Sequence, residues 1–346
     1  MSPETLKTEV LIIGKGVSGL ILHLLLERKG IKSILIDKVS SKQNLPLAET
    51  IPPSTLTLLE EIDFLPLFET FSTKTYGYQS KWNSSQISDE NFFLKGKYGY
   101  GLKINKQKII SALQQQSNRI ISVKDISQLE TKKNTNTILI KKLNDKITSI
   151  ESNIIVDATG RKRHILKQVN INSIEYDSNL AYLCYVPKKG PSLKYGFFTE
   201  SFENAWGTIS DLNETTRIVS LYTSKENESY KLFKDFTNWS YLLDKTELLK
   251  LCIPRNGNFK VYGKLANSSV PSKITFQNII SIGDAAMSFN PISSHGVSNA
   301  IYTAKEAALA IEKHMTSNKY SLVNYDKKMH TIFKEYFNQK EKLYQL

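Results

Sequence analysis

The fold is decided by residues 8–37, which read TEVLIIGKGVSGLILHLLLERKGIKSILID. The apolar run at residues 8–13 predicts a buried parallel strand. Apolar residues recur at helical spacing over 17–29, which predicts a helix that Gly30 ends. Residues 33–37 predict a second strand that finishes on an acid. Together these residues predict a complete β-α-β unit at the start of the chain.

The turn between this strand and helix carries glycine in the pattern Gly14-x-Gly16-x-x-Gly19. In such a turn the first glycine permits the tight bend, the second lets a pyrophosphate approach the backbone, and the third allows close helix–strand packing. The helix N-terminus then faces the phosphates. Asp37 is expected to accept hydrogen bonds from a ribose hydroxyl, and its charge disfavours a 2′-phosphate. The unit therefore predicts a dinucleotide site, without distinguishing NAD from FAD.

Composition limits the class of protein. The chain has 346 residues, 40% of them hydrophobic and 23% charged, which is typical of a soluble globular protein with room for two joined domains. No apolar run reaches the roughly 18 residues of a transmembrane segment, and the N-terminus lacks the layout of a secretory signal, so a cytoplasmic protein is expected. Only Cys184 and Cys252 occur, far apart, which predicts neither a disulfide framework nor a metal site.

The net charge of +13 comes mostly from lysine. Basic clusters such as Arg161-Lys162-Arg163 are not interleaved with aromatic residues. They therefore predict a solvated surface and no nucleic-acid site.

Further elements follow from periodicity and turn residues. A helix is expected over 56–62 with Ser54 as its N-cap. Strands at 137–141 and 147–156 predict a β-meander, and β-rich runs between 180 and 222 predict a mostly antiparallel sheet. Helical stretches are expected at 230–236, 241–251, 297–315 and 322–343, and a buried strand at 279–282.

Two later segments carry glycine and aspartate where a strand ends. They are Ile155-Val156-Asp157-Ala158-Thr159-Gly160-Arg161 and Gly283-Asp284-Ala285-Ala286, the latter followed by Pro291 and Gly296. With the first glycine turn, their order and spacing resemble the flavin-dependent monooxygenase and halogenase superfamily over essentially the whole chain. The resemblance implies FAD, with Asp284 at the ribityl chain and residues 291–296 beside the isoalloxazine. The next helix would direct its N-terminus at the flavin and stabilise its anionic reduced form.

The residues expected to contact FAD are Gly14, Gly16, Val17, Ser18, Gly19, Asp37, Asp157, Gly160, Gly283, Asp284, Pro291, Gly296 and Val297. Only one dinucleotide fingerprint is present. The reducing electrons are therefore expected from NAD(P)H that docks transiently or from a separate flavin reductase.

The same resemblance implies an α/β fold, α+β overall. It consists of a Rossmann-like FAD-binding domain, an inserted and mostly antiparallel substrate domain, and C-terminal helices. The FAD-binding domain is expected over 1–75, 98–165 and 270–315, and the substrate domain over 76–97 and 166–269. Residues 316–346 are expected to form a C-terminal helix.

Four local patterns most resemble the maturation flavoproteins of tryptophylquinone oxidases, the lysine- and glycine-oxidase maturases. They are Glu49-Thr-Ile-Pro52-Pro53, Ser80-Lys81-Trp82-Asn83-Ser84, Tyr98-Gly-Tyr-Gly101-Leu-Lys-Ile-Asn105 and Pro291-Ile-Ser-Ser-His-Gly296. This likeness implies a monooxygenase that inserts oxygen into an electron-rich aromatic substrate through a flavin C4a-hydroperoxide. The substrate would be a tryptophan or similar aromatic, free or carried by a partner protein or peptide. Asn105 departs from the pattern, in which an arginine commonly precedes the helix.

Two other functions remain open. A flavin-dependent halogenase is one, because residues 49–53 resemble the halogenase Glu-x-x-x-Pro loop. In addition, Lys74 precedes Trp82 by eight residues, the spacing of the halogenase catalytic lysine. The halogenase Trp-x-Trp-x-Ile-Pro signature, however, is matched only by Ala-Trp-Gly-Thr-Ile-Ser at 205–210. The other is a maturation factor that binds a client protein and holds the flavin structurally.

Four residues are candidates for the chemistry. His295 is expected beside the flavin as a proton donor or a substrate hydrogen-bond partner, since histidine titrates near neutrality; alternatively it only shapes the loop. Trp82 and Trp206 either stack on an aromatic substrate or pack in the core. Lys74 is either a catalytic lysine or a surface residue.

Overall fold

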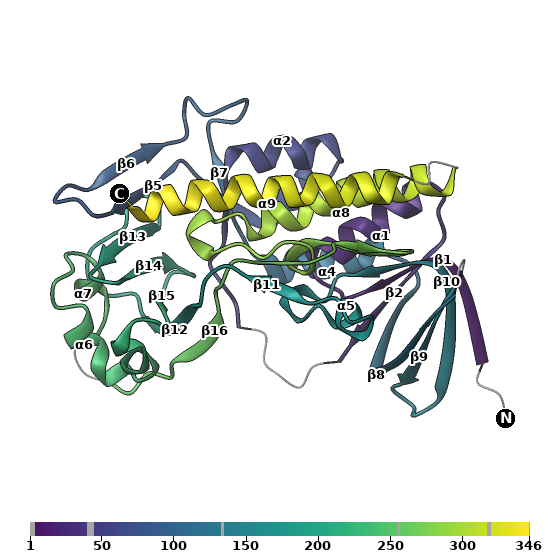
Figure 1. Ribbon diagram of the computed structural model, residues 1–346. Coiled ribbons are helices and arrows are strands. Elements are labelled where there is room, and N and C mark those ends of the chain that lie inside the picture. Colours follow the sequence, from purple (N-terminus) through teal and green to yellow (C-terminus); the bar gives the residue numbers. More distant parts are fainter. Residues whose placement is uncertain (1–3, 40–44, 133–134, 255–256, 317–319, 346) are drawn as a thin grey trace.

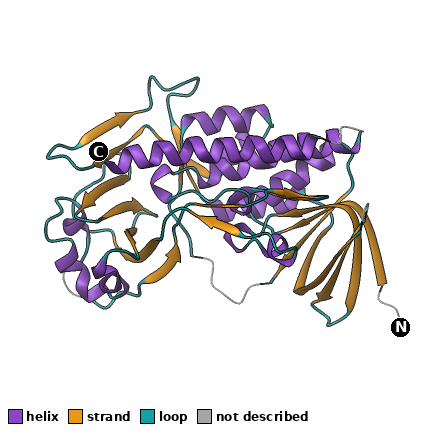
Figure 2. Cartoon of the chain, viewed as in Figure 1, coloured by secondary structure: helices purple, strands orange, loops and turns teal. Residues whose placement is uncertain are grey.

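Two seven-stranded sheets carry most of the strands in the computed structural model, which describes residues 4–39, 45–132, 135–254, 257–316 and 320–345 (Figure 1). They lie toward opposite ends of the molecule (Figure 2). The predicted β-α-β unit is confirmed as β1 (Glu4–Ile13), α1 (Val17–Arg28) and β2 (Ser33–Lys38). β1 pairs in parallel with β2 and with β10 (Ile147–Asp157).

The first sheet is buried on both faces at β1. Val10 and Ile12 pack into the cluster that contains α1 and α8 (Gly296–Met315), whereas Leu11 and Ile13 pack into the cluster on the other face. A strand covered on both sides reads as a continuous apolar run, as residues 10–13 do. The predicted meander is confirmed by antiparallel pairing of β8, β9 and β10. The other strands of this sheet are β8 (Ile120–Thr131), β9 (Asn136–Lys142), β18 (Thr275–Phe276) and β19 (Ile279–Ser281).

The second sheet is antiparallel except where β5 pairs in parallel with β13. That pairing joins the early segment 77–91 to a sheet built mainly from residues 179–265. The sheet has its own apolar core, which includes Phe198 and Trp239. Its strands are β5 (Gly77–Lys81), β6 (Ser88–Asn91), β12 (Asn179–Pro187), β13 (Phe197–Phe202), β14 (Ala205–Asp211), β15 (Thr216–Ser224) and β16 (Tyr262–Leu265).

Two smaller sheets complete the strands. One contains β3 (Thr50–Ile51), β4 (Ser72–Thr75) and β7 (Gly101–Ile104), and the other β11 (Ser173–Glu175) and β17 (Ser269–Pro271). The domain boundaries expected from the sequence stay a prediction.

The long helix α9 (Ser321–Gln345) runs beside α8 and ends near the second sheet (Figure 1). Its Lys340 is buried and forms an ion pair with Asp177 at 2.9 Å, which fixes that end. The remaining helices are α2 (Pro53–Glu61), α3 (Leu65–Thr70), α4 (Lys106–Gln116), α5 (His164–Gln168), α6 (Trp239–Leu242) and α7 (Leu249–Cys252). Short 3₁₀ helices are η1 (Gly160–Lys162), η2 (Glu228–Lys234), η3 (Phe236–Asn238), η4 (Gly283–Ala285) and η5 (Pro291–Ser293). No helix in the described ranges is long and apolar enough to cross a membrane.

Three sequence-based expectations were wrong. Ser54 is not an N-cap, because α2 begins earlier, at Pro53, whose fixed φ suits the first helical position. The segment 228–252 forms four short helical pieces, two of them 3₁₀, where two longer helices were expected. Arg163 is only 2% exposed and does not belong to a solvated basic surface.

Candidate cofactor and substrate site

The glycine turn after β1 is packed so tightly that two of its glycines are required by the protein itself. Gly14 has φ +115°, and a side chain there would overlap the carbonyl oxygen of Ala158. A side chain at Gly19 would overlap the carbonyl oxygen of Gly14. The turn, the start of α1 and the end of β10 therefore form one compact unit.

Gly16 is different, because a Cβ built on it meets nothing within 4 Å. Its φ of −78° is accessible to any residue, so the fold itself does not demand glycine there. Next to it, the backbone N–H of Lys15 donates to the Asp37 carboxylate at 3.1 Å. An open backbone at a helix start, with an acid beside it, fits the pyrophosphate and ribose of a dinucleotide.

The other residues predicted in this turn lie at the start of α1. Val17 and Ser18 are both buried. The Ser18 side chain lies against Gly283, which brings the first glycine turn and the later Gly283-Asp284 turn together.

The Asp157 carboxylate is fully buried and accepts four hydrogen bonds. The donors are the backbone N–H and hydroxyl of Thr159, at 3.0 and 2.6 Å, and the backbone N–H groups of Ile165 and Leu166, at 2.9 and 3.1 Å. Such a set organises the turn from β10 to α5. Gly160, within that turn, has open space where a side chain would lie. Direct contact of Asp157 with a cofactor stays a prediction, and its own partners favour a structural role.

Arg163 holds this turn to the Gly283-Asp284 turn. Its guanidinium donates to the Ala285 carbonyl at 3.0 Å, to the Ser269 carbonyl at 2.9 Å and to the Ser173 hydroxyl at 2.9 Å. Burial lowers the pKa of Arg163 to about 10. Sequence reasoning missed this residue because three adjacent basic side chains are typical of a surface.

Asp284 lines a cavity of about 1650 Å³ between the second sheet and the loop that precedes α8. Burial raises the pKa of its carboxyl, against the opposing effect of Arg161, whose Nε lies 3.5 Å away. Arg161 also donates to the Phe289 carbonyl at 2.7 Å. Pro291, Gly296 and Val297 line the same cavity.

Trp82 and Trp206 lie together on the cavity wall, with ring centroids 6.0 Å apart. Trp206 stacks on Tyr222 at 3.8 Å. Both indole N–H groups are used by the end of α9: Trp82 donates to the Leu343 carbonyl at 3.1 Å and Trp206 to the Tyr344 hydroxyl at 2.9 Å. Each tryptophan therefore packs against other aromatic rings and also lines the cavity. The indole N–H of each already has a hydrogen-bond acceptor on α9.

The loop before α8 is held by an aromatic contact from α9. Tyr336 stacks on Phe289 at 4.2 Å, and its hydroxyl accepts the backbone N–H of Asn290 at 2.7 Å and contacts the Ser268 hydroxyl at 3.0 Å. The loop that faces the cavity is thus positioned by Tyr336, which follows Asn290 by 46 residues in the chain.

Tyr336→Phe is expected to lower the free energy of unfolding by about 1–2 kcal/mol, because it leaves a buried backbone N–H without its acceptor. Chemical denaturation measures this change. Tyr241→Phe, at a side chain that is 78% exposed, is the control and should have little effect. Equal stability of the two variants would contradict the role given to the Tyr336 hydroxyl.

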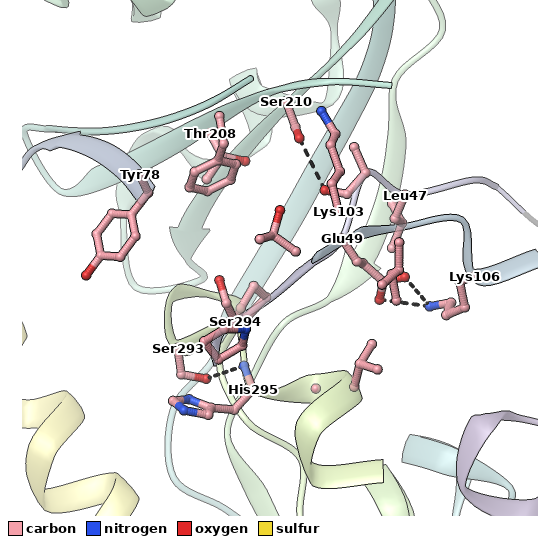
Figure 3. Close-up of a pocket in the computed structure, with 18 of the residues that line it drawn as sticks. Leu47, Glu49, Tyr78, Lys103, Lys106, Thr208, Ser210, Ser293, Ser294 and His295 are labelled. Atoms are coloured by element: carbon pink, nitrogen blue, oxygen red, sulfur yellow. Dashed lines mark hydrogen bonds and ion pairs between the residues drawn. The ribbon is translucent and has the colours of Figure 1, made fainter. Parts of the chain in front are cut away.

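His295 caps α8 and lines the cavity (Figure 3). Its ring meets Phe289 edge-on at 6.5 Å. Surrounding protein lowers the pKa of His295 below the ordinary value of 6.5, so the imidazole is mostly neutral at pH 7.

Lys74 does not line the cavity. It is exposed, and its Nζ lies 4.0 Å from the centre of the Tyr100 ring. In the register of β4 with β7, Lys74 pairs with Leu102, whereas the preceding Thr73 pairs with Lys103. Since neighbouring residues of a strand face opposite sides, it is Lys103 that reaches the cavity. The sequence spacing to Trp82 could not reveal this alternation.

Within the described ranges, no group of three or more His, Cys, Asp or Glu side chains could hold a metal ion.

Comparison with known proteins gives the family context of this geometry. The FAD-binding domain family matches residues 7–339. LodB of Marinomonas mediterranea, described as a candidate FAD-dependent oxidoreductase, is 20% identical over 97% of this chain and 92% of its own length.

Solved structures share the fold at low identity. The p-nitrophenol 4-monooxygenase PnpA of Pseudomonas putida superposes with a TM-score of 0.78 at 13% identity, over 96% of this chain and 87% of its own. The peptidyl tryptophan dihydroxylase QhpG, essential for tryptophylquinone cofactor biogenesis, superposes with a TM-score of 0.75 at 14% identity, over 98% of this chain and 75% of its own.

Proposed function

This chain belongs to the FAD-binding domain family and is an FAD-dependent oxidoreductase, and we propose that it acts as a monooxygenase on an electron-rich aromatic substrate. The substrate we favour is a tryptophan side chain of a partner protein or peptide. The observation that carries the proposal is that the loop before α8 and the Trp82–Trp206 wall line the same cavity. Protein cavities of this kind, apolar with a few polar groups, are typical of small-molecule and cofactor sites.

We assign the cofactor contacts from the glycine turn to the cavity. Gly16 and the start of α1 would hold the pyrophosphate, Asp37 the ribose and Asp284 the ribityl chain. Residues 291–297 would lie along the flavin ring. When bound, reduced FAD supplies the two electrons that allow one atom of O₂ to enter the ring while the other leaves as water. Those electrons would come from NAD(P)H or from a separate flavin reductase.

The chain's own residues would orient the substrate and exclude water. The aromatic wall offers flat apolar surface to an indole or phenol ring, and α9 closes that wall through Leu343 and Tyr344. Water excluded from such a site cannot compete for a reactive oxygen species. The fold likeness to QhpG, which acts on a peptidyl tryptophan, supports a substrate of the same kind.

The test is mass spectrometry of candidate client peptides and proteins after incubation with the FAD-loaded protein, a reductant and ¹⁸O₂. We expect a gain of one or two oxygen atoms that carry the label. An unchanged client, despite reduction and reoxidation of the flavin, would contradict the proposal and favour a client-binding factor with a structural flavin. A bromine or chlorine added in the presence of halide would instead favour the halogenase alternative, for which the exposed Lys74 offers no support.

His295 should make turnover depend on pH. Because protein surroundings lower its pKa, the neutral imidazole predominates at neutral pH and the cation forms as the solution becomes acidic. If the neutral ring accepts a proton from the substrate, the turnover rate should fall as the pH drops and the imidazole becomes protonated. In His295→Gln this decrease of the rate at acidic pH, the acid limb, should be absent. Rate profiles from pH 5 to 8 measure this. A limb that persists in His295→Gln would exclude His295 as its origin.

A further inference from the structure

We propose that Lys103 makes the cavity a binding site for a carboxylate, so that the aromatic substrate carries an acidic group. This inference rests on the proposed function, because it takes the cavity as the substrate site. Lys103 lies on β7 and is half-buried in the cavity wall. Its Nζ donates a hydrogen bond to the Gly196 carbonyl at 3.3 Å. Among the described residues no carboxylate lies within ion-pair distance of it.

The other cations that line the cavity are either paired with a protein carboxylate or, like Lys108 and Lys264, exposed to solvent. Lys106 pairs with Glu49 at 2.7 Å, Lys95 pairs with Glu90, and Arg161 faces Asp284. These side chains have counter-ions supplied by the protein. Lys103 therefore stands out as an interior cation whose counter-ion has to come from elsewhere.

The surroundings of Lys103 carry an excess of positive charge. Asp211 is the nearby carboxylate, and it is already used by Arg217 at 2.6 Å and by Lys188 at 2.9 Å. Burial raises the pKa of Asp211, but these two hydrogen-bonded cations outweigh it and lower the pKa. Three cations thus share one ionised carboxylate. Burying an uncompensated cation is unfavourable, and an anionic ligand would relieve that cost.

The position of Lys103 suits a substrate that spans the cavity. Figure 3 draws Lys103 and Ser210 on one side of the cavity and Ser293, Ser294 and His295 on the other. A substrate with its carboxylate at Lys103 could therefore direct its ring toward the loop before α8. The ligand chemistry is a carboxylate, either of a free aromatic acid or of an Asp or Glu side chain close to a tryptophan in a peptide.

The experiment is calorimetric titration of the FAD-loaded protein with matched acid and amide ligands. Indole-3-propionate is compared with indole-3-propionamide, and Ac-Trp-Gly-Glu-NH₂ with Ac-Trp-Gly-Gln-NH₂. We expect each acid to bind at least about 10-fold more tightly than its amide, which is the effect of one charge-assisted hydrogen bond. Preference in the first pair supports a free acid, and in the second an acidic peptide.

Lys103→Met should abolish that preference, and Lys103→Arg should keep it. Lys264→Met, at another lysine that lines the cavity, is the matched control and should also keep it. Burial lowers the pKa of Lys103 to about 8, against the nearby Asp211, so the acid should bind about 10-fold more weakly at pH 9 than at pH 7.

Equal affinity of acid and amide would overturn the carboxylate site and leave the aromatic site intact. A preference that survives in Lys103→Met would also overturn it, and would mean that Lys103 only supports the Gly196 carbonyl. If no aromatic ligand binds, the proposed substrate site fails together with this inference.

Discussion

Gly16→Val is expected to weaken FAD binding by about 100-fold or more while leaving the cofactor-free protein folded. The new side chain would extend into the open space where the pyrophosphate is expected, and it would remove charge-assisted hydrogen bonds to the turn worth about 1.5–3 kcal/mol each. No atom outside Gly16, its chain neighbours and the adjacent helix backbone lies within 4 Å of the new Cβ, so the free energy of unfolding should change by no more than about 1 kcal/mol, the effect of a poorer N-cap. Titration of the cofactor-free protein with FAD measures the affinity.

Two other glycines serve as controls for Gly16→Val. Gly14→Ala should destabilise the protein itself, because its Cβ overlaps the Ala158 carbonyl oxygen and its φ of +115° disfavours any side chain. Gly263→Ala meets only ordinary contact with Tyr182 at 3.8 Å and should bind FAD normally. Normal FAD binding by Gly16→Val would contradict the assignment of the pyrophosphate to this turn.

Arg163→Met is expected to lower the free energy of unfolding by about 3–5 kcal/mol, since it leaves several buried acceptors unsatisfied. The side chain is 2% exposed and connects Ser173, Ser269 and Ala285, which lie on three different parts of the chain. The same loss should loosen the Gly283-Asp284 turn, and FAD affinity should fall with stability. Urea denaturation of the cofactor-free protein measures the first effect.

The matched control for Arg163→Met is Lys162→Met, because Lys162 is the exposed neighbour in the same basic cluster. It should change stability by less than about 0.5 kcal/mol. If the two variants were equally stable, the guanidinium would not be the connection that the hydrogen bonds indicate.

The parts of the fold that the sequence predicted well are governed by local pattern. β1, α1 and β2 were predicted within a few residues, because apolar runs and glycine spacing are enough to specify a β-α-β unit. The segment 228–252 was predicted poorly. Its short 3₁₀ and α pieces pack under the second sheet, with Trp239 fully buried, so tertiary packing outweighs helical periodicity there.

Residues of the candidate site could be predicted where they lie in one local motif. They could not be predicted where segments distant in the sequence come together. Asp284, Pro291 and Gly296 line one cavity, and their contact with FAD stays a prediction. Lys103 was not distinguished from the many other lysines, because its burial depends on the register of β4 with β7. The contact of Trp206 with α9 likewise joins residues far apart in the chain, so no local sequence pattern could predict it.

The most direct test of the central claim is a crystal structure of the FAD-loaded protein. We predict the pyrophosphate at Gly16 and the start of α1, with the flavin ring along residues 291–297 and one edge open to the cavity that Trp82 and Trp206 line. A flavin ring bound outside that cavity, or a pyrophosphate away from the glycine turn, would contradict the account.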